Sequence, residues 1–188
     1  MTLRGIFFGP NGLRAGWRLA FFIAIVCVLL RASSLVVNSL LHGLDSGVLW
    51  LIMEFMAFLD YLVASWIVGK FEKRTLADYG LPRRQMFQRR FWQGAAIGFV
   101  SISVLIGAMA ALGILRFGGT TLSGGAIAQW AITYAIVFLI VSLKEEFSVR
   151  GYGLYTLSTG IGFWPAAVAT SVYFGFIHRG IPARVGSG

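Results

Sequence analysis

Five long apolar stretches, separated by short polar ones, run along the chain. They comprise Trp17–Leu41, Gly47–Gly69, Phe91–Leu115, Ala126–Leu143 and Phe163–Ile177. A helix that crosses a bilayer needs about 20 predominantly apolar residues, and the first three stretches reach that length alone. The last two are short by this measure. The pattern predicts an all-α, polytopic membrane helical bundle with about five transmembrane helices.

Composition narrows the class of protein further. Hydrophobic residues make up 57% of the 188 positions and charged residues only 12%, which is too little charge for the surface of a soluble domain. The net charge of +9 is typical of some nucleic-acid-binding proteins, but here most Lys and Arg residues lie between the apolar stretches. Basic loops of this kind contact anionic lipid. We therefore expect the lipid bilayer as a partner, and no nucleic acid.

The distribution of positive charge predicts an orientation. The segment Lys70–Arg90 carries seven Lys or Arg residues and two acids, and the N-terminal arm up to Arg18 carries three Arg. Positive loops stay on the cytoplasmic side, so the N-terminus and Lys70–Arg90 are expected there, in a bacterial plasma membrane. Lys70–Arg90 fits either an interfacial amphipathic helix or a solvated topology signal, and we favour the signal. The single cysteine, Cys27, excludes an internal disulfide and is expected to face lipid or the core.

Charged residues inside the apolar stretches are costly and therefore informative. In the first hairpin, Arg31 lies about 13 residues before the turn, and Glu54 and Asp60 lie about 10 and 16 residues after it. At about 1.5 Å per residue, Arg31 is level with the gap between the two acids. We expect a structural ion pair between Arg31 and one of them, and a pathway for protons or ions is the alternative interpretation.

The stretch "IVSLKEEFSVRGYG" (140–153) adds four charges, Lys144, Glu145, Glu146 and Arg150, after an apolar run. On a helix, Glu146 and Arg150 are four residues apart in the favourable order, so Glu146 has a local partner. Glu145 points about 100° away into an apolar setting and has none. A carboxylate placed in this way can take a proton from water.

A histidine at the same depth completes this argument. If the helix continues through its charges from Ala126 to Ser158, the sequence "TGIG" (159–162) forms a turn and Phe163–His178 returns antiparallel. Glu145 then lies about 15 residues before the turn and His178 about 17 after it, so both are roughly 22–26 Å from the turn. We expect their side chains to lie within about 10 Å of one another, because packed helices are 8–10 Å apart.

Two short motifs resemble a known family. "EEFSVRG" (145–151) followed by "FGFIH" (174–178) is similar to the Glu-Glu-x-x-x-Arg and Phe-x-x-x-His motifs of the CPBP intramembrane proteases. This family includes type II CAAX prenyl endopeptidases and bacteriocin-processing, abortive-infection-like proteins. The resemblance extends from about Val137 to His178, with a weaker similarity in "KRTLADYGLP".

The resemblance implies roles for these residues. Glu145 would activate water for hydrolysis of a peptide bond in a membrane-associated protein or peptide, with Glu146 and His178 as further catalytic residues. Arg150 would hold Glu146, and Phe174 would support the site. The family has been described as metalloproteases, but a glutamate-activated water without metal is also argued for it. A divalent metal such as zinc would take Glu145 and His178, whereas zinc sites usually use three or four ligands, so no cofactor is expected.

A third motif of the family, a His-x-x-x-Asn/Asp-like pattern on a later helix, has no counterpart here. No histidine follows His178, and residues 179–188 are polar. Three segments are expected: 1–125 with the N-terminal helices and basic loop, 126–178 with a partial catalytic core as a helical hairpin, and 179–188 as a tail. We expect an endopeptidase of this family, as an active enzyme or an inactive truncated copy. The alternatives are a non-catalytic membrane immunity or scaffold protein and a small transporter component.

Overall fold

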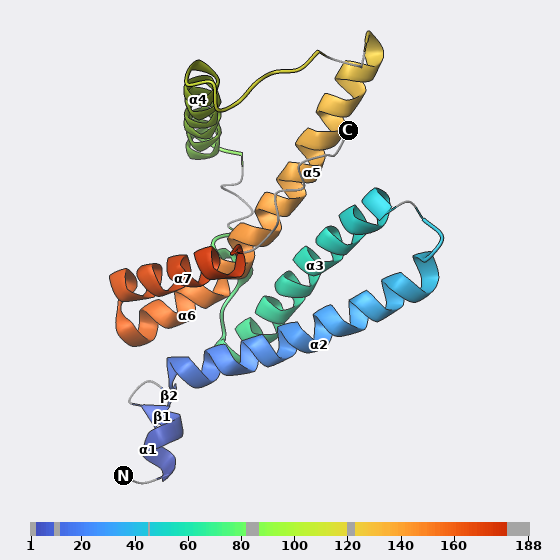
Figure 1. The fold of residues 1–188 in the computed structure, drawn as a ribbon. Coiled ribbons are helices and arrows are strands. Elements are labelled where there is room, and N and C mark those ends of the chain that lie inside the picture. Colours follow the sequence, from blue (N-terminus) through green and yellow to red (C-terminus); the bar gives the residue numbers. More distant parts are fainter. Residues whose placement is uncertain (1–2, 10–11, 45, 82–86, 120–122, 180–188) are drawn as a thin grey trace. The chain divides into compact units, whose positions relative to one another are not determined.

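The computed structural model describes residues 3–9, 12–44, 46–81, 87–119 and 123–179. The chain is almost entirely helical (Figure 1). Its elements, in order, are α1 (Leu3–Phe7), β1 (Phe8–Gly9), β2 (Gly12–Leu13), α2 (Ala15–Leu41), α3 (Ser46–Glu72), the 3-10 helix η1 (Leu76–Tyr79), α4 (Arg89–Ala111), α5 (Gly125–Arg150), α6 (Tyr152–Ile161) and α7 (Phe163–Ile177). The strands form a two-residue antiparallel ribbon in which Phe8 pairs with Leu13.

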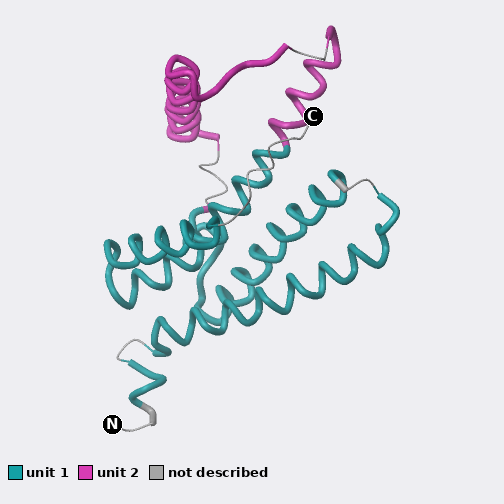
Figure 2. Tube along the Cα trace, viewed as in Figure 1, with its two compact units in different colours: residues 1–80, 137–188 teal, residues 81–136 magenta. Residues whose placement is uncertain are grey.

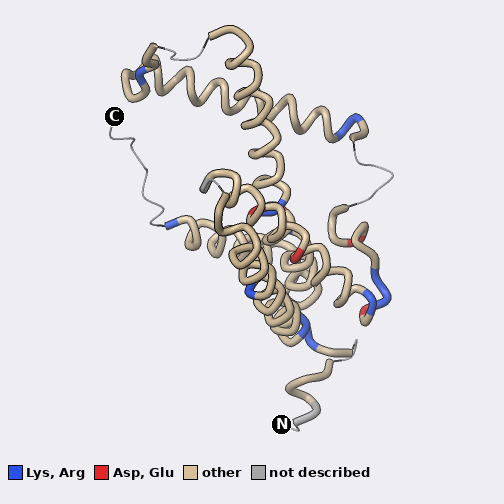
Figure 3. Tube along the Cα trace, turned by 90° about the vertical axis from the view of Figure 1, so that its right-hand side faces the viewer, with Lys and Arg blue, Asp and Glu red and all other residues tan. Residues whose placement is uncertain are grey.

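The expected membrane-spanning character is confirmed at the level of length and composition. Four described helical stretches are long and apolar enough to cross a bilayer: Ala15–Leu41, Gly47–Glu72, Arg89–Ala111 and Gly125–Ile161, the last of which comprises α5 and α6. The fifth apolar stretch forms α7, whose 15 residues are fewer than the roughly 20 that a perpendicular span needs. Charged residues gather in a few short groups along otherwise uncharged helices (Figure 3). The chain is therefore an all-α, polytopic integral membrane protein.

Two units make up the chain. Residues 1–80 and 137–188 form the first, and residues 81–136 form the second, so that the division falls within α5 (Figure 2). The second unit contains α4, which has no buried residue. The site described below lies wholly in the first unit. The division into segments 1–125, 126–178 and 179–188 stays a prediction. Of the last segment, residues 180–188 lie outside the described residues.

The core of the first unit lies where α2 packs against α3 and α6. Phe22 of α2 stacks against Tyr152 of α6 with ring centroids 4.5 Å apart, and the Tyr152 side chain is completely buried. Tyr79 of η1 packs edge-on against both Tyr152 and Tyr155, at 5.1 and 5.3 Å. Aromatic side chains bury a large area each, so this cluster accounts for much of the packing at this end of the unit.

The basic segment Lys70–Arg90 is therefore more than the solvated topology signal that we favoured. Tyr79 is only 2% exposed. Burial raises the pKa of the Tyr79 phenol above its usual range, and the nearby Glu72 carboxylate raises it further, so the phenol stays neutral. A charge pattern reports which side of a membrane a loop occupies, but it does not exclude that part of the loop packs into the core. Residues 82–86 of this segment lie outside the described residues.

The helical hairpin at the C-terminal end is confirmed, with one difference. α6 and α7 pack antiparallel, and the chain reverses at Gly162, whose φ of 85° favours glycine. The helix that was expected to run unbroken from Ala126 to Ser158 is interrupted at Gly151, where φ is −68° and ψ is −116°. A Cβ at this position would collide with the carbonyl oxygen of Phe147. Glycine permits this break, so α5 and α6 follow one another as two helices.

Candidate active site

The structure brings Glu145 of α5 and His178 together. Oε1 of Glu145 lies 3.5 Å from Nε2 of His178, and the two side chains are 34% and 36% exposed. His178 caps the C-terminal end of α7. The expected distance of less than about 10 Å is confirmed. The similar number of residues from the turn at Gly162 puts both residues at the same depth, and the packing of the helices turns their side chains toward one another.

Hydrogen bonding fixes the orientation of the imidazole. Nδ1 of His178 lies 2.8 Å from the carbonyl oxygen of Phe174, one helical turn earlier. A carbonyl oxygen can only accept, so Nδ1 carries the proton and Nε2 faces Glu145. The Phe174 ring also packs against the imidazole, with centroids 4.3 Å apart. Phe174 therefore supports His178 with both its backbone and its ring.

The two facing side chains have room for one proton between them. With Nδ1 protonated, the neutral imidazole offers a lone pair on Nε2, and a carboxylate offers only lone pairs. Two acceptors at 3.5 Å attract one another only when one of them holds an additional proton. Glu145 and His178 therefore form a pair that can bind one proton and pass it to a third group, such as a water molecule, between them.

Glu146 and Arg150 pair as the sequence predicts. Nη1 of Arg150 donates to both oxygens of Glu146, at 3.1 and 3.0 Å. Both side chains are 62% exposed, so the pair contributes little to stability by itself. Glu146 is paired with Arg150 whereas Glu145 faces His178, so the two neighbouring glutamates occupy different settings.

Two cavities meet at Glu145. One, of about 340 Å³, is lined by Glu145, Glu146, Arg150 and Phe174 among others. The other, of about 510 Å³, is lined by Glu145, His178, Lys144, Glu54 and Tyr61 among others. Glu145 lines both cavities, so its carboxyl group is accessible to small molecules from two sides.

A second ion pair lies in the larger cavity, and sequence analysis missed it. Nζ of Lys144 lies 2.8 Å from Oε2 of Glu54, and both side chains are about four-fifths buried. Glu54 had been assigned to Arg31 as one of two candidate partners. The signal for the correct partner was present, because Lys144 is the basic residue beside the two glutamates of α5. What the sequence could not supply was the packing of α5 beside α3.

The predicted pairing of Arg31 is wrong within the described residues. Arg31 is exposed and makes no ion pair with any of them, whereas Asp60 accepts a hydrogen bond of 2.6 Å from Ser33. Ser33 follows Arg31 by two residues, which is about 200° around a helix. The level was therefore predicted correctly, but the face of α2 that meets Asp60 carries Ser33.

The described residues do not fit a metal site. Nowhere among them do three His, Cys, Asp or Glu side chains come together in a way that could hold a metal ion. Glu145 and His178 supply two donors, and Glu54, in the same cavity, is bound to Lys144. Catalytic zinc usually has three protein ligands, so the donor set is incomplete. We derive no step through a metal.

One of three comparisons with known proteins found a match. No curated protein and no solved structure matches the chain. Residues 127–185 match the family model described as Rce1-like, type II CAAX prenyl endopeptidase Rce1-like. The matched segment includes Glu145, Glu146, Arg150, Phe174 and His178. Residues 127–185 are thus similar to the type II CAAX prenyl endopeptidase family, and the resemblance based on the two motifs is confirmed.

Proposed function

We propose that this protein is an intramembrane endopeptidase that hydrolyses a peptide bond of a membrane-associated protein or peptide. The observation that carries the proposal is the approach of Glu145 to His178 across α5 and α7, within cavities that admit water. The family match and the four apolar helices support a CAAX-protease-like membrane protein.

Glu145 acts as the general base in this mechanism. Its carboxylate takes a proton from a water molecule, and the water oxygen bonds to the carbonyl carbon of the scissile peptide. As the tetrahedral intermediate collapses, the carbon–nitrogen bond breaks and the departing nitrogen receives a proton from the Glu145–His178 pair. His178 is suited to this exchange, because its Nδ1 is held by the Phe174 carbonyl while Nε2 faces the carboxyl group.

Glu146 and Arg150 have a supporting role. An unpaired second carboxylate beside Glu145 would raise the cost of ionising either group. Arg150 neutralises Glu146 through two hydrogen bonds and so leaves Glu145 as the carboxylate available to water.

No metal takes part in the proposed reaction. In the proposed orientation, the N-terminus and the basic segment Lys70–Arg90 face the cytoplasm of a bacterial plasma membrane.

The test is cleavage of a farnesylated fluorogenic peptide ending in a CAAX sequence by the full chain in liposomes. Wild type should cleave it, and Glu145→Gln should lose at least about 10²-fold in rate, within the range that general acid–base groups contribute. Asp78→Asn is the matched control, since it makes the same change from carboxylate to amide at an exposed position outside the cavities. Equal rates for wild type and Glu145→Gln would refute the role of Glu145, and no cleavage by wild type would refute the activity.

A further inference from the structure

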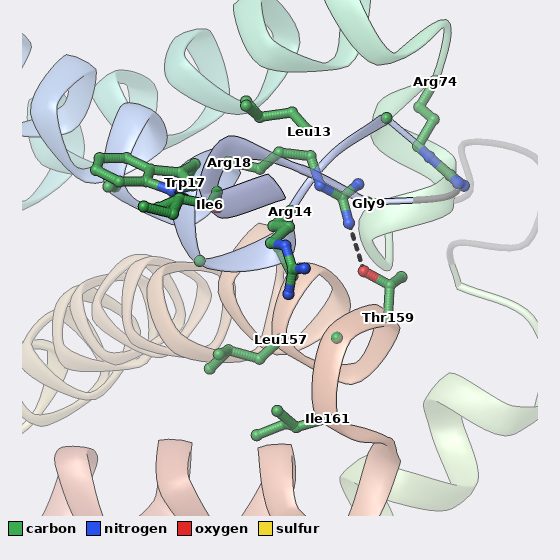
Figure 4. A pocket seen from close by; sticks show the side chains of 15 residues that line it. Ile6, Gly9, Leu13, Arg14, Trp17, Arg18, Arg74, Leu157, Thr159 and Ile161 are labelled. Atoms are coloured by element: carbon green, nitrogen blue, oxygen red, sulfur yellow. Dashed lines mark hydrogen bonds between the residues drawn. The ribbon is translucent and has the colours of Figure 1, made fainter. Parts of the chain in front are cut away.

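A third cavity lies at the opposite end of the first unit from the α2–α3 turn. It has a volume of about 930 Å³ and is lined by the start of α2, the end of α6, the ribbon before α2 and Arg74. In Figure 4 the side chains of Arg14, which directly precedes α2, and of Arg18 in α2 extend toward the end of α6, which carries Thr159. We call this space the arginine cavity, after Arg14, Arg18 and Arg74.

The arginine cavity lies at the end of several apolar helices. α2 begins at Ala15, α3 ends at Glu72 and α6 ends at Ile161. Two contacts of Arg18 join these ends: Nη2 donates to Thr159 at 2.5 Å, and Nη1 lies 3.4 Å from Glu72. Helices that span a bilayer end near its headgroups, and Trp17, which lines the cavity, is of the type enriched at that level.

Positive charge in the arginine cavity exceeds the negative charge beside it. Arg18 and Arg74 share one carboxylate, that of Glu72, at 3.4 and 3.7 Å. Arg14 makes no ion pair with any described residue, and it precedes Arg18 by four positions, where like charges repel. Nε of Arg18 is buried and has no hydrogen-bond partner among the residues that the structure describes. Three arginines therefore line the cavity, and Glu72 is the carboxylate that two of them share.

We propose that the arginine cavity binds a phosphate-bearing anion. A guanidinium group offers paired N–H donors that match two oxygens of one phosphate, and basic pockets between helix ends at the cytoplasmic level bind lipid headgroups. The bound anion supplies the charge that Glu72 alone does not. The phosphate comes from the headgroup of an anionic phospholipid or from the free ion. This site is separate from the cavities at Glu145 and does not depend on the proposed peptidase activity.

The experiment is thermal unfolding of the full chain in dodecyl maltoside micelles. Dioctanoyl phosphatidylglycerol, dioctanoyl phosphatidylcholine and inorganic phosphate are titrated separately. Arg14→Gln removes a guanidinium that holds no protein partner, so this variant should fold, and Arg74→Gln removes a second one independently. Arg90→Gln is the matched control, because it deletes the same charge from the exposed start of α4.

Phosphatidylglycerol should raise the Tm of wild type and Arg90→Gln. In Arg14→Gln and in Arg74→Gln the concentration for half of the shift should rise about fivefold, as expected from about 1 kcal/mol for each basic residue near a lipid surface. An equal shift with inorganic phosphate, with the same dependence on Arg14, would identify the free ion as the source. The proposal is overturned if no added phosphate compound raises the Tm, or if both cavity variants respond as Arg90→Gln does.

Discussion

Glu72 and Glu145 are the same residue type in the same unit, yet their surroundings differ. Glu72 contacts Arg18 and Arg74 and accepts a hydrogen bond of 2.5 Å from the Tyr152 hydroxyl, and its side chain is 11% exposed. Glu145 has one side-chain partner, His178 at 3.5 Å, and is 34% exposed. One carboxylate is enclosed by donors, whereas the other lines two cavities.

The difference separates a structural carboxylate from a reactive one. A group whose acceptor sites are filled by cations and a hydroxyl holds its neighbours in place and has little capacity left for water. A group with one titratable partner and open space on two sides can exchange a proton. Both glutamates belong to chains of contacts between helices, so proximity to other helices does not distinguish them. The two glutamates differ instead in the number of hydrogen-bond donors and cations around each carboxylate.

Replacing each glutamate in turn should give the largest difference in the free energy of unfolding between the two sites. Glu72→Gln leaves Arg18 and Arg74 without their shared counter-charge, and removing one member of a buried charge pair costs about 3 kcal/mol. Glu145→Gln should change the free energy of unfolding by less than about 1 kcal/mol, because the side chain is partly exposed and its partner, His178, lies at 3.5 Å. Chemical unfolding of both variants in dodecyl maltoside measures this. Equal losses would show that the two sites do not differ in the way described.

The pair of Lys144 and Glu54 tests whether an enclosed ion pair also supports the reactive site. Lys144→Met should destabilise by about 2 kcal/mol, because it leaves Glu54 partly buried without its cation. The double reversal Lys144→Glu with Glu54→Lys should recover part of the loss. Arg31→Gln is the control, since Arg31 makes no ion pair with a described residue. Losses that simply add in the double reversal would contradict the pairing.

Tyr152→Phe isolates one contact of Glu72. The change removes the hydroxyl that donates to Oε1 of Glu72 and keeps the ring that packs against Phe22. A hydrogen bond to a charged group contributes about 1.5 kcal/mol or somewhat more, so the free energy of unfolding should fall by about that amount. Tyr155→Phe is the control, because no contact of its hydroxyl supports Glu72. An unchanged stability for Tyr152→Phe would show that Glu72 is held by its arginines alone.

The smallest expected effect lies outside the membrane-spanning helices, at Asp78. The backbone N–H of Thr75 and then its hydroxyl donate to this carboxylate, at 2.7 and 3.0 Å, and lower the pKa of Asp78 below its usual 3.8. A lowered folded-state pKa contributes stability that is present above the unfolded pKa and is lost as pH falls through the folded pKa. The Tm should therefore show a small acid-dependent loss that Asp78→Asn lacks. Parallel pH profiles would contradict this.

The sequence predicts depth along the helices better than direction around them. The apolar stretches gave the spans, and counting residues from the turn placed Glu145 level with His178. Counting also placed Arg31 level with the acids of α3, but a helix turns about 100° per residue, and Ser33 occupies the facing side. The contacts of Lys144 with Glu54, and of Tyr152 with Glu72, join residues 80 or more positions apart, and their partners depend on how the helices pack.

Residue type alone also fails to predict the contacts of Glu72 and the helix break at Gly151. Glu72 lies in a strongly basic segment whose charges indicate topology. Nothing local to "KFEKRTLADYG" shows that Glu72 contacts Arg18 and Tyr152, which lie on other helices. The break at Gly151 was also unexpected, since one glycine within a helical pattern is common. Only the close approach of the Phe147 carbonyl shows why glycine is needed there.

The central claim is that Glu145 and His178 act together on one water molecule, and a double-mutant cycle in the rate of peptide cleavage tests it most directly. Wild type, Glu145→Gln, His178→Ala and the double variant are compared on the farnesylated fluorogenic peptide in liposomes. Residues that act as a unit are not additive, so each single variant should lose about 10²-fold or more and the double variant should be no slower than the slower single one. Losses that multiply in the double variant, or a Glu145→Gln protein that cleaves as fast as wild type, would contradict the account.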